Sequence, residues 1–185
     1  AGDTDSKPKI IEQFPNLKAI YRAGVGKDNV PIDECKNKGI ILEFPSEETR
    51  NILFEETANY TISLILHMVY PTPSISLPWK KESRNSLKKK SALIIGTGNI
   101  GSRVEEKLKT MMTVSTYDIL TNETKDLEIL IRNADIVSLH IPNMPENNNF
   151  LDEKRLSWMK EGAILVNTAR ANLVDEESLY QEINI

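Results

Sequence analysis

From Ser91 to the end of the chain, short apolar segments alternate regularly with longer helical patterns. Strands that are separated by helical stretches of about 10–15 residues indicate parallel βαβ units, because antiparallel neighbours need only a short turn. The expected strands are Ser91–Ile95, Thr113–Asp118, Asp135–His140 and Ala163–Thr168. The expected helices are Ile100–Thr110, Lys125–Arg132, Asp152–Met159 and one that starts at Asp175. The alternation therefore predicts an α/β fold with a parallel sheet between helices.

The first 70 residues repeat this alternation in a shorter form. The expected elements are strands at Lys18–Arg22 and Ile40–Phe44, a helix at Asn29–Lys38 and a long helix after Ser46. In the long helix, apolar residues at spacings of four and three predict one buried stripe: Ala58, Ile62, Ile65 and Val69. The proline-containing, basic stretch from Pro71 to Lys90 is typical of a solvated linker, which we favour over an anion-binding patch. We predict two domains, residues 1–87 and 88–185.

The charge balance and the single cysteine exclude several classes of protein. The 23 basic and 27 acidic residues give a net charge of −4, which argues against a protein-wide basic face for nucleic acid. No apolar run reaches the roughly 18 residues that span a membrane. Cys35 alone cannot form an internal disulfide or a thiolate metal cluster. We therefore expect a cytoplasmic protein without a metal site, a membrane anchor or a nucleic-acid partner.

The most informative motif is the glycine loop Gly96-Thr97-Gly98-Asn99-Ile100-Gly101. It follows an apolar strand and opens a helix, as in dinucleotide-binding folds, where the glycines allow a tight turn, a close pyrophosphate and close helix packing. Asp118 ends the next strand, 22 residues after Gly96, where a carboxylate accepts the ribose hydroxyls and repels a 2′-phosphate. A plain strand-to-helix turn and a strand-end cap are the alternatives. The order and spacing together favour NAD over NADP.

Three separated segments extend this interpretation. They are Arg22–Val30, the glycine loop with Asp118, and the stretch that runs from Ala134–Pro142 through Met159–Leu179. With these segments the chain resembles the D-isomer-specific 2-hydroxyacid dehydrogenase family, and within it members like phosphoglycerate dehydrogenase and glyoxylate/hydroxypyruvate reductase. The resemblance implies an incomplete Rossmann-type parallel sheet with strand order 3-2-1-4 and a crevice between its first and fourth strands. It also implies part of a flavodoxin-like substrate domain.

The resemblance also implies roles for individual residues. Arg170 matches the catalytic arginine, and Val25 and Gly26 match the amides that hold the substrate carboxylate. The implied cofactor-binding residues are Gly96, Gly98, Asn99, Ile100, Gly101, Asp118, His140, Ile141, Pro142, Thr168, Ala169 and Arg170. Without the resemblance, Arg170 reads as an ion-pair partner of Asp175 or Glu176, and Val25-Gly26 as a plain turn. Ala171 departs from the family pattern, which has a glycine after the arginine, and an added methyl is awkward where φ is positive.

The activity that the resemblance implies is NAD-dependent oxidation and reduction at the CH–OH group of a small 2-hydroxy or 2-keto acid, in a homodimer. The family's acid/base histidine and its orienting glutamate match no residue of this chain, which contains only His67 and His140. We therefore expect an incomplete chain that binds NAD and turns over slowly, because general acid/base catalysis is worth about 10²–10⁴ in rate. The alternatives are a catalytically silent NAD-binding, redox-sensing interaction protein of the same family and, less favoured because of Asn167–Arg170, another Rossmann protein with an adenosine cofactor.

Overall fold

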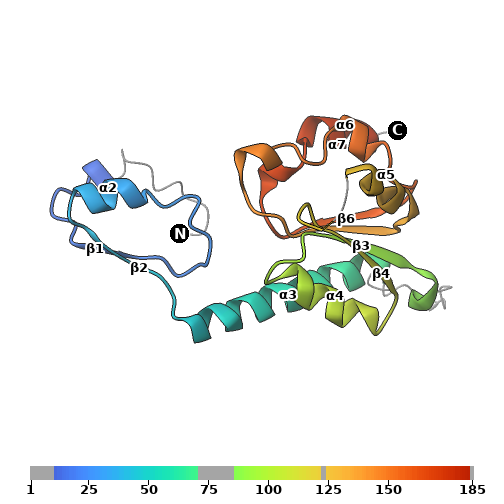
Figure 1. The fold of residues 1–185 in the computed structure, drawn as a ribbon, viewed down its shortest axis with the longest axis horizontal. Helices are drawn as coiled ribbons and strands as arrows, with labels where there is room; N and C mark the ends of the chain where they lie inside the picture. The colour runs from blue at the N-terminus through green and yellow to red at the C-terminus, as the bar shows by residue number, and fades with distance from the viewer. Residues whose placement is uncertain (1–10, 71–85, 122–123, 184–185) are drawn as a thin grey trace, which may run out of the picture. The chain divides into compact units, whose positions relative to one another are not determined.

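The computed structural model describes residues 11–70, 86–121 and 124–183. By backbone contacts the chain divides into two compact units, Ala1–Phe54 and Glu55–Ile185, and Figure 1 shows the fold of each. Most of the predicted linker, residues 71–85, lies outside the described residues.

The first unit is built on a pair of short parallel strands. Strand β1 (Ala19–Tyr21) pairs with β2 (Ile41–Glu43), and helix α2 (Ile32–Asn37) connects them. A small apolar core of Ile11, Cys35 and Ile40 holds the helix against the strands. The expected strand–helix–strand order of this region is confirmed, with each element shorter than its pattern predicts.

Helix α3 (Glu47–Val69) is the longest element of the chain. Its first turn is capped by Ser46, whose Oγ accepts a hydrogen bond from the amide of Thr49 at 3.2 Å. Of the predicted stripe, Ala58 and Ile65 are buried, and Ile62 and Val69 are half-buried against the same cluster. The buried Thr61 adds a polar residue that the pattern did not predict. Across the described ranges, no helix combines the length and apolar character that crossing a membrane requires.

The second unit contains a four-stranded parallel sheet. Its strands are β3 (Ser91–Ile95), β4 (Thr113–Tyr117), β5 (Ile136–Leu139) and β6 (Ile164–Asn167), in the order β4-β3-β5-β6. The inner strands β3 and β5 are buried almost throughout, as continuous apolar runs covered on both faces should be. Strand β4 alternates exposed and half-buried residues up to the buried Tyr117 because it lies at one edge. The apolar strand β6 lies at the other edge, as the sequence predicts.

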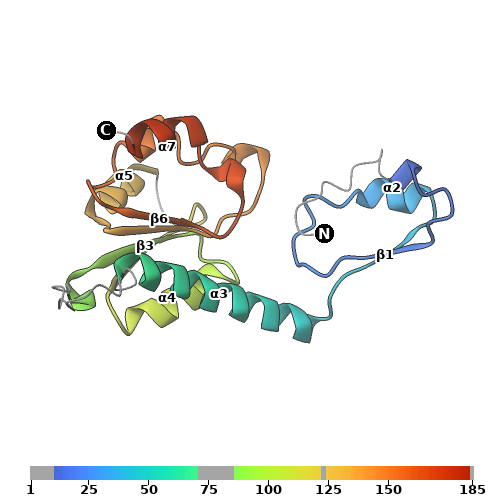
Figure 2. The same cartoon turned by 180° about the vertical axis from the view of Figure 1, so that it is seen from behind.

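Helices cover both faces of this sheet, as Figures 1 and 2 show. Helix α4 (Gly101–Lys109) lies with α3 on one face, where Ile65, Val104 and Leu108 belong to one buried cluster. Helices α5 (Thr124–Asn133), α6 (Glu153–Leu156) and α7 (Glu176–Ile183) cover the other face, around Leu127, Ile131 and Leu156. Three single 3₁₀ turns complete the unit: η1 (Leu87–Lys89), η2 (Pro145–Asn147) and η3 (Ala171–Leu173).

The predicted strand order 3-2-1-4 is wrong. In order of sequence, the four strands lie 2-1-3-4, because β5 pairs with β3 and not with β4. The reason is the face on which α5 lies: α4 and α5 cover opposite faces, and right-handed crossovers on opposite faces move the chain in opposite directions across a sheet. In this order the connections reverse between β3 and β5, so the crevice at the carboxyl ends lies there and not between the first and fourth strands.

Candidate functional site

The glycine loop follows β3 and opens onto α4, and its three glycines have different surroundings. Gly96 has a φ of 92°, and a Cβ there would lie 2.7 Å from the carbonyl oxygen of His140. A Cβ on Gly101 would lie 1.9 Å from the carbonyl oxygen of Gly96. Gly98 has no atom within 4 Å of a Cβ position and faces open space. The first and third glycines therefore allow close packing, and the second leaves the loop's backbone open to a ligand.

The loop after β5 packs directly against the glycine loop. The amide of His140 donates a hydrogen bond to the carbonyl of Ile95 at 2.7 Å, which ties the ends of the two inner strands together. The ring Nε2 of His140 lies 2.9 Å from Oγ of the buried Ser138. Burial lowers the pKa of His140 to about 4, so its ring is neutral near pH 7. Ile141 is half-buried, whereas Pro142 is exposed.

Asp118 follows β4 and faces the glycine loop. Its Oδ2 accepts hydrogen bonds from the amide and the hydroxyl of Thr97, both at 2.9 Å, and its Oδ1 accepts one from the amide of Leu120 at 3.0 Å. These bonds, first those from the Thr97 and Leu120 amides, lower the pKa of the Asp118 carboxyl below its ordinary value. The structure thus brings a fixed negative charge to the loop that the sequence assigns to the cofactor.

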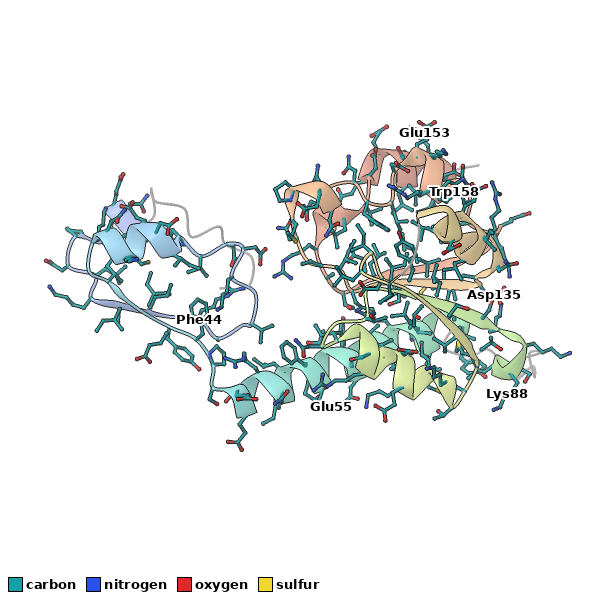
Figure 3. All side chains as sticks on the ribbon, in the orientation of Figure 1. Phe44, Glu55, Lys88, Asp135, Glu153 and Trp158 are labelled. Carbon is teal, nitrogen blue, oxygen red and sulfur yellow. The ribbon has the colours of Figure 1, made fainter. Side chains whose placement is uncertain are left out.

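The other two residues of the glycine loop serve the start of α4. The carbonyl oxygen of the exposed Asn99 accepts a hydrogen bond from the guanidinium of Arg103. Ile100 packs against the cluster of buried residues under α4. Arg103 also forms an ion pair with Glu55 of α3 at 3.4 Å, and Nζ of Lys107 lies 2.5 Å from the Glu55 carboxylate. Glu55 is labelled on α3 in Figure 3. The glycine loop therefore leads into α4, which these ion pairs hold against α3.

The turn after β6 carries Thr168, Ala169 and Arg170, and Asn167 closes it. Oδ1 of Asn167 accepts a hydrogen bond from the amide of Ala169 at 3.0 Å, and its Nδ2 donates to the carbonyl of Arg170 at 2.7 Å. The half-buried Arg170 donates from its Nη1 to the carbonyl of Ala169 at 2.9 Å. Among the described residues only Asn149 is a non-glycine with positive φ, so Ala171 fits without strain.

Thr168 also connects this turn to helix α3. Its hydroxyl oxygen lies 2.9 Å from the hydroxyl oxygen of Thr61, which itself donates to the carbonyl of Thr57 at 2.9 Å. Thr61 is fully buried, so the two hydroxyls meet away from water. The turn that carries Arg170 is therefore held from inside by Asn167 and from the side by α3.

In the first unit, the turn with Val25 and Gly26 follows β1. Arg22 closes it, because its Nε donates to the carbonyl of Gly26 at 3.2 Å and its amide donates to the carbonyl of Glu43 at 2.9 Å. Both Val25 and Gly26 are half-buried. Asn29, which follows the turn, has a buried Oδ1 without a hydrogen-bond partner. The carboxylate-binding role of this turn stays a prediction.

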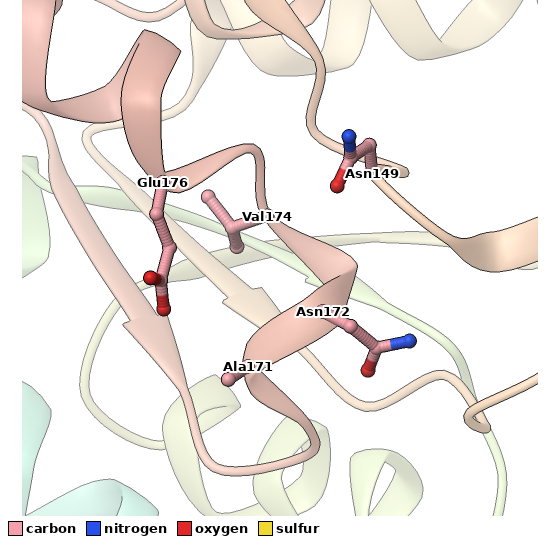
Figure 4. A pocket seen from close by; sticks show the side chains of 5 residues that line it. All are labelled: Asn149, Ala171, Asn172, Val174 and Glu176. Carbon is pink, nitrogen blue, oxygen red and sulfur yellow. The ribbon is translucent and has the colours of Figure 1, made fainter.

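Figure 4 shows a hollow that sequence reasoning did not predict. It has a volume of about 360 Å³ and is lined by Asn149, Ala171, Asn172, Val174 and Glu176. Four of the five lining residues follow Arg170 in the sequence, and none of the five is a predicted site residue. In the described part of the chain, no group of three or more His, Cys, Asp or Glu side chains could hold a metal ion.

The residues at the ends of β3, β4 and β5 fit a dinucleotide. Gly98 leaves the backbone open where a pyrophosphate needs close approach, and the amino end of α4 adds amides and a positive dipole. Asp118 presents a carboxylate to the same loop. Sequence reasoning missed Thr97 and Asn167, which hold Asp118 and the Arg170 turn. Thr97 lies inside the glycine motif and Asn167 lies directly before Thr168, but their hydrogen-bond partners depend on the fold and could not be read from the sequence.

Comparisons with known proteins point to one family. Residues 76–184 match the model described as D-isomer specific 2-hydroxyacid dehydrogenase, NAD binding domain. Residues 2–52 match the model described as the catalytic domain of the same dehydrogenases. Together the two matches include every residue for which the sequence predicts a role at the site.

Individual relatives agree with these matches. A hydroxypyruvate reductase of Thermotoga maritima is 35% identical over 94% of this chain, and a D-3-phosphoglycerate dehydrogenase of Archaeoglobus fulgidus is 31% identical over 95%. The chain spans 60% and 36% of the lengths of these two relatives. A structure of D-lactate dehydrogenase from Aquifex aeolicus, complexed with NAD and lactic acid, matches 96% of this chain and 57% of that chain with a TM-score of 0.77 and 31% identity.

Proposed function

The chain belongs to the D-isomer-specific 2-hydroxyacid dehydrogenase family, and from this we propose that it is the NAD-binding part of an oxidoreductase acting on a D-2-hydroxy acid. The observation that carries the proposal is the glycine loop at the crevice between β3 and β5, with Asp118 held against it. The loop has the open backbone that a pyrophosphate requires, and Asp118 has the charge that suits unmodified ribose hydroxyls. The Aquifex aeolicus relative, solved with NAD and lactic acid, supports the same ligand classes.

In the proposed reaction, C2 of the hydroxy acid would lose a hydride and its hydroxyl group would lose a proton to a base. NAD, when bound, supplies the hydride acceptor. Arg170 holds the substrate carboxylate and polarises the C2 oxygen with its permanent charge. The resemblance to the family assigns a carboxylate-binding role to the amides of Val25 and Gly26 in the first unit. Thr168, Ala169 and Arg170 would line the nicotinamide end of a bound NAD, and His140, Ile141 and Pro142 would line its adenosine end.

Neither histidine of the chain suits the base of this reaction. His140 is neutral near pH 7, but its pKa of about 4 makes it a poor proton acceptor, and its Nε2 already bonds to Ser138. His67 lies exposed on α3. We propose that the acid/base histidine and its orienting glutamate are supplied by other residues than these 185.

The proposal is tested by titrating the chain with NADH and following the nicotinamide fluorescence. We expect saturable binding, and we expect Asp118→Ala to weaken it about tenfold because the ribose loses a charge-assisted hydrogen bond. Ser115→Ala, on the same edge strand, serves as the control because its side chain is exposed and it lies outside the predicted site. Absence of saturable binding by the unmodified chain, or an Asp118→Ala variant that binds as tightly, would contradict the assignment.

A second candidate is a catalytically silent member of the family that binds NAD as a redox-sensing interaction module. It would use the same loop and Asp118 but would need no base. A glutamate and a later histidine in sequence beyond Ile185 of the natural protein favour the enzyme. Their absence favours the silent protein, because general acid/base catalysis supplies about 10²–10⁴ of the rate.

We also propose that the whole protein is a cytoplasmic homodimer that acts on a small 2-hydroxy or 2-keto acid and has no nucleic-acid or membrane partner. The resemblance to the family supports the dimer and the substrate class. The lone, buried Cys35 and the net charge of −4 support the compartment and argue against a nucleic acid.

A further inference from the structure

The carboxylate of Asp118 is held from two separate loops. The amide and hydroxyl of Thr97, which lies between the first two glycines, both reach Oδ2 at 2.9 Å. The amide of Leu120, in the turn after β4, reaches Oδ1 at 3.0 Å. The amide of Gly96 also donates to the carbonyl of Tyr117 at 2.8 Å, so the glycine loop and the end of β4 are joined at two successive residues.

Of the hydrogen bonds that Thr97 and Leu120 donate to this carboxylate, only the one from the Thr97 hydroxyl depends on a particular side chain. Backbone amides at positions 97 and 120 are available with any residue except proline. The hydroxyl bond needs a serine or a threonine at position 97, and valine would keep the shape of threonine while losing that bond. Thr97 is also half-buried, between the buried Gly96 and the exposed Gly98. Its hydroxyl bonds to Asp118 and its side chain is therefore not free to turn in solvent.

We propose that Thr97 is a positioning residue for Asp118 and that it thereby sets how strongly the site discriminates NAD from NADP. The inference rests on the proposed function and deepens it. With Oδ2 held by two donors, the carboxylate keeps one orientation before a cofactor arrives. A carboxylate that is held in this way cannot rotate away from the 2′-phosphate of NADP, so the two negative charges repel each other. A loosely held carboxylate could rotate away and reduce this repulsion. The same bonds lower the pKa of the Asp118 carboxyl, in agreement with a carboxylate that is held in its charged form.

The test compares the dissociation constants of NADH and NADPH, both followed by fluorescence. In Thr97→Val we expect the ratio of the NADPH constant to the NADH constant to fall about three- to tenfold, the scale of one charge-assisted hydrogen bond. Thr97→Ser, which keeps a hydroxyl, should recover the ratio of the unmodified chain. In an Asp118→Asn background, Thr97→Val should change the ratio no further, because its effect passes through the carboxylate charge.

Thr110→Val is the matched control. The Thr110 hydroxyl donates to the carbonyl of Lys107 at 2.8 Å at the exposed end of α4, outside the cofactor loop. Its loss removes a hydroxyl-to-backbone bond in the same unit and should leave the ratio unchanged. Should Thr97→Val fail to fold, Thr97→Ala removes the same hydroxyl for the same comparison.

Three results would overturn the inference while leaving NAD binding intact. The first is a Thr97→Val variant that binds NADH and NADPH more weakly by the same factor, so that the ratio of their dissociation constants is unchanged. The second is a Thr97→Ser variant whose ratio stays as low as that of Thr97→Val. The third is a Thr97→Val substitution that lowers the ratio as much in the Asp118→Asn background as in the unmodified chain. A chain that binds neither NADH nor NADPH would instead overturn the proposed function on which the inference rests.

Discussion

At the scale of single residues, the three motif glycines occupy three different environments. Gly96 and Gly101 lie against backbone carbonyl groups, whereas Gly98 faces open space. A motif written as three equal glycines therefore contains two packing positions and one position open to a ligand. The distinction follows from the fold, because the groups that crowd Gly96 belong to His140 and Ile141 in the loop after β5.

Gly98→Ala and Gly101→Ala should therefore fail in different ways. In Gly101→Ala the new methyl meets the carbonyl of Gly96, and we expect the free energy of unfolding to fall by about 2 kcal/mol or more. In Gly98→Ala we expect that free energy to change by less than about 0.5 kcal/mol, while NADH binding weakens because the methyl lies on the open side of the loop. Urea titration and NADH titration of both variants check this. Unaltered NADH affinity in Gly98→Ala would remove Gly98 from the site.

Sequence reasoning at this scale found Asp118 but not the residue that holds it. The spacing from Gly96 to Asp118 is visible in the sequence, because it spans one helix and the strand that follows. The contact between Asp118 and Thr97 requires β3 and β4 to be neighbours in register, which the spacing alone does not establish. The predicted roles of Arg170, Val25 and Gly26 depend on a bound substrate and stay predictions.

At the scale of elements, the strands and helices of the second unit were predictable and their order was not. The periodicity of the sequence marks each strand to within a residue or two, because central parallel strands are continuously apolar. Strand order depends on the face that each crossover helix takes. A signal was present: three of the five residues of Thr113–Tyr117 are polar, which fits an edge strand, whereas Ile136–Leu139 is mostly apolar and fits the centre.

Ser138 of β5 and His140, directly after it, form a polar pair that should make the stability of the fold depend on pH. Burial lowers the pKa of His140 from 6.5 to about 4, so the unfolded chain binds a proton in this range that the folded chain does not. The free energy of unfolding should therefore fall as the pH drops, by about 2 kcal/mol between pH 7 and pH 5. Urea titrations at the two pH values measure it. His140→Gln should flatten the dependence, and an equally steep dependence in that variant would assign it to another group.

At the scale of the whole molecule, the chain consists of two compact units that match two parts of one family. The backbone contacts divide the chain after Phe54, whereas the sequence predicts a boundary after residue 87. The two divisions differ because most of α3 belongs to the second unit by its contacts and to the first domain in the sequence-based prediction. Ala58 and Ile65 of α3 pack in the core of the second unit. Composition and periodicity cannot show to which unit such a helix belongs, because its buried stripe would be equally apolar in either unit.

The central claim is that the loops at the carboxyl ends of β3, β4 and β5 bind NAD. The most direct measurement is an amide nitrogen–hydrogen correlation spectrum of the chain during a titration with NAD⁺. We expect saturable shifts at Gly96–Gly101, Leu120 and His140, and little change at Ser91, Thr113 and Ile136, which lie at the amino ends of the same strands. Shifts that gather instead around Asn149, Asn172 and Glu176, or no saturable shifts, would contradict the claim.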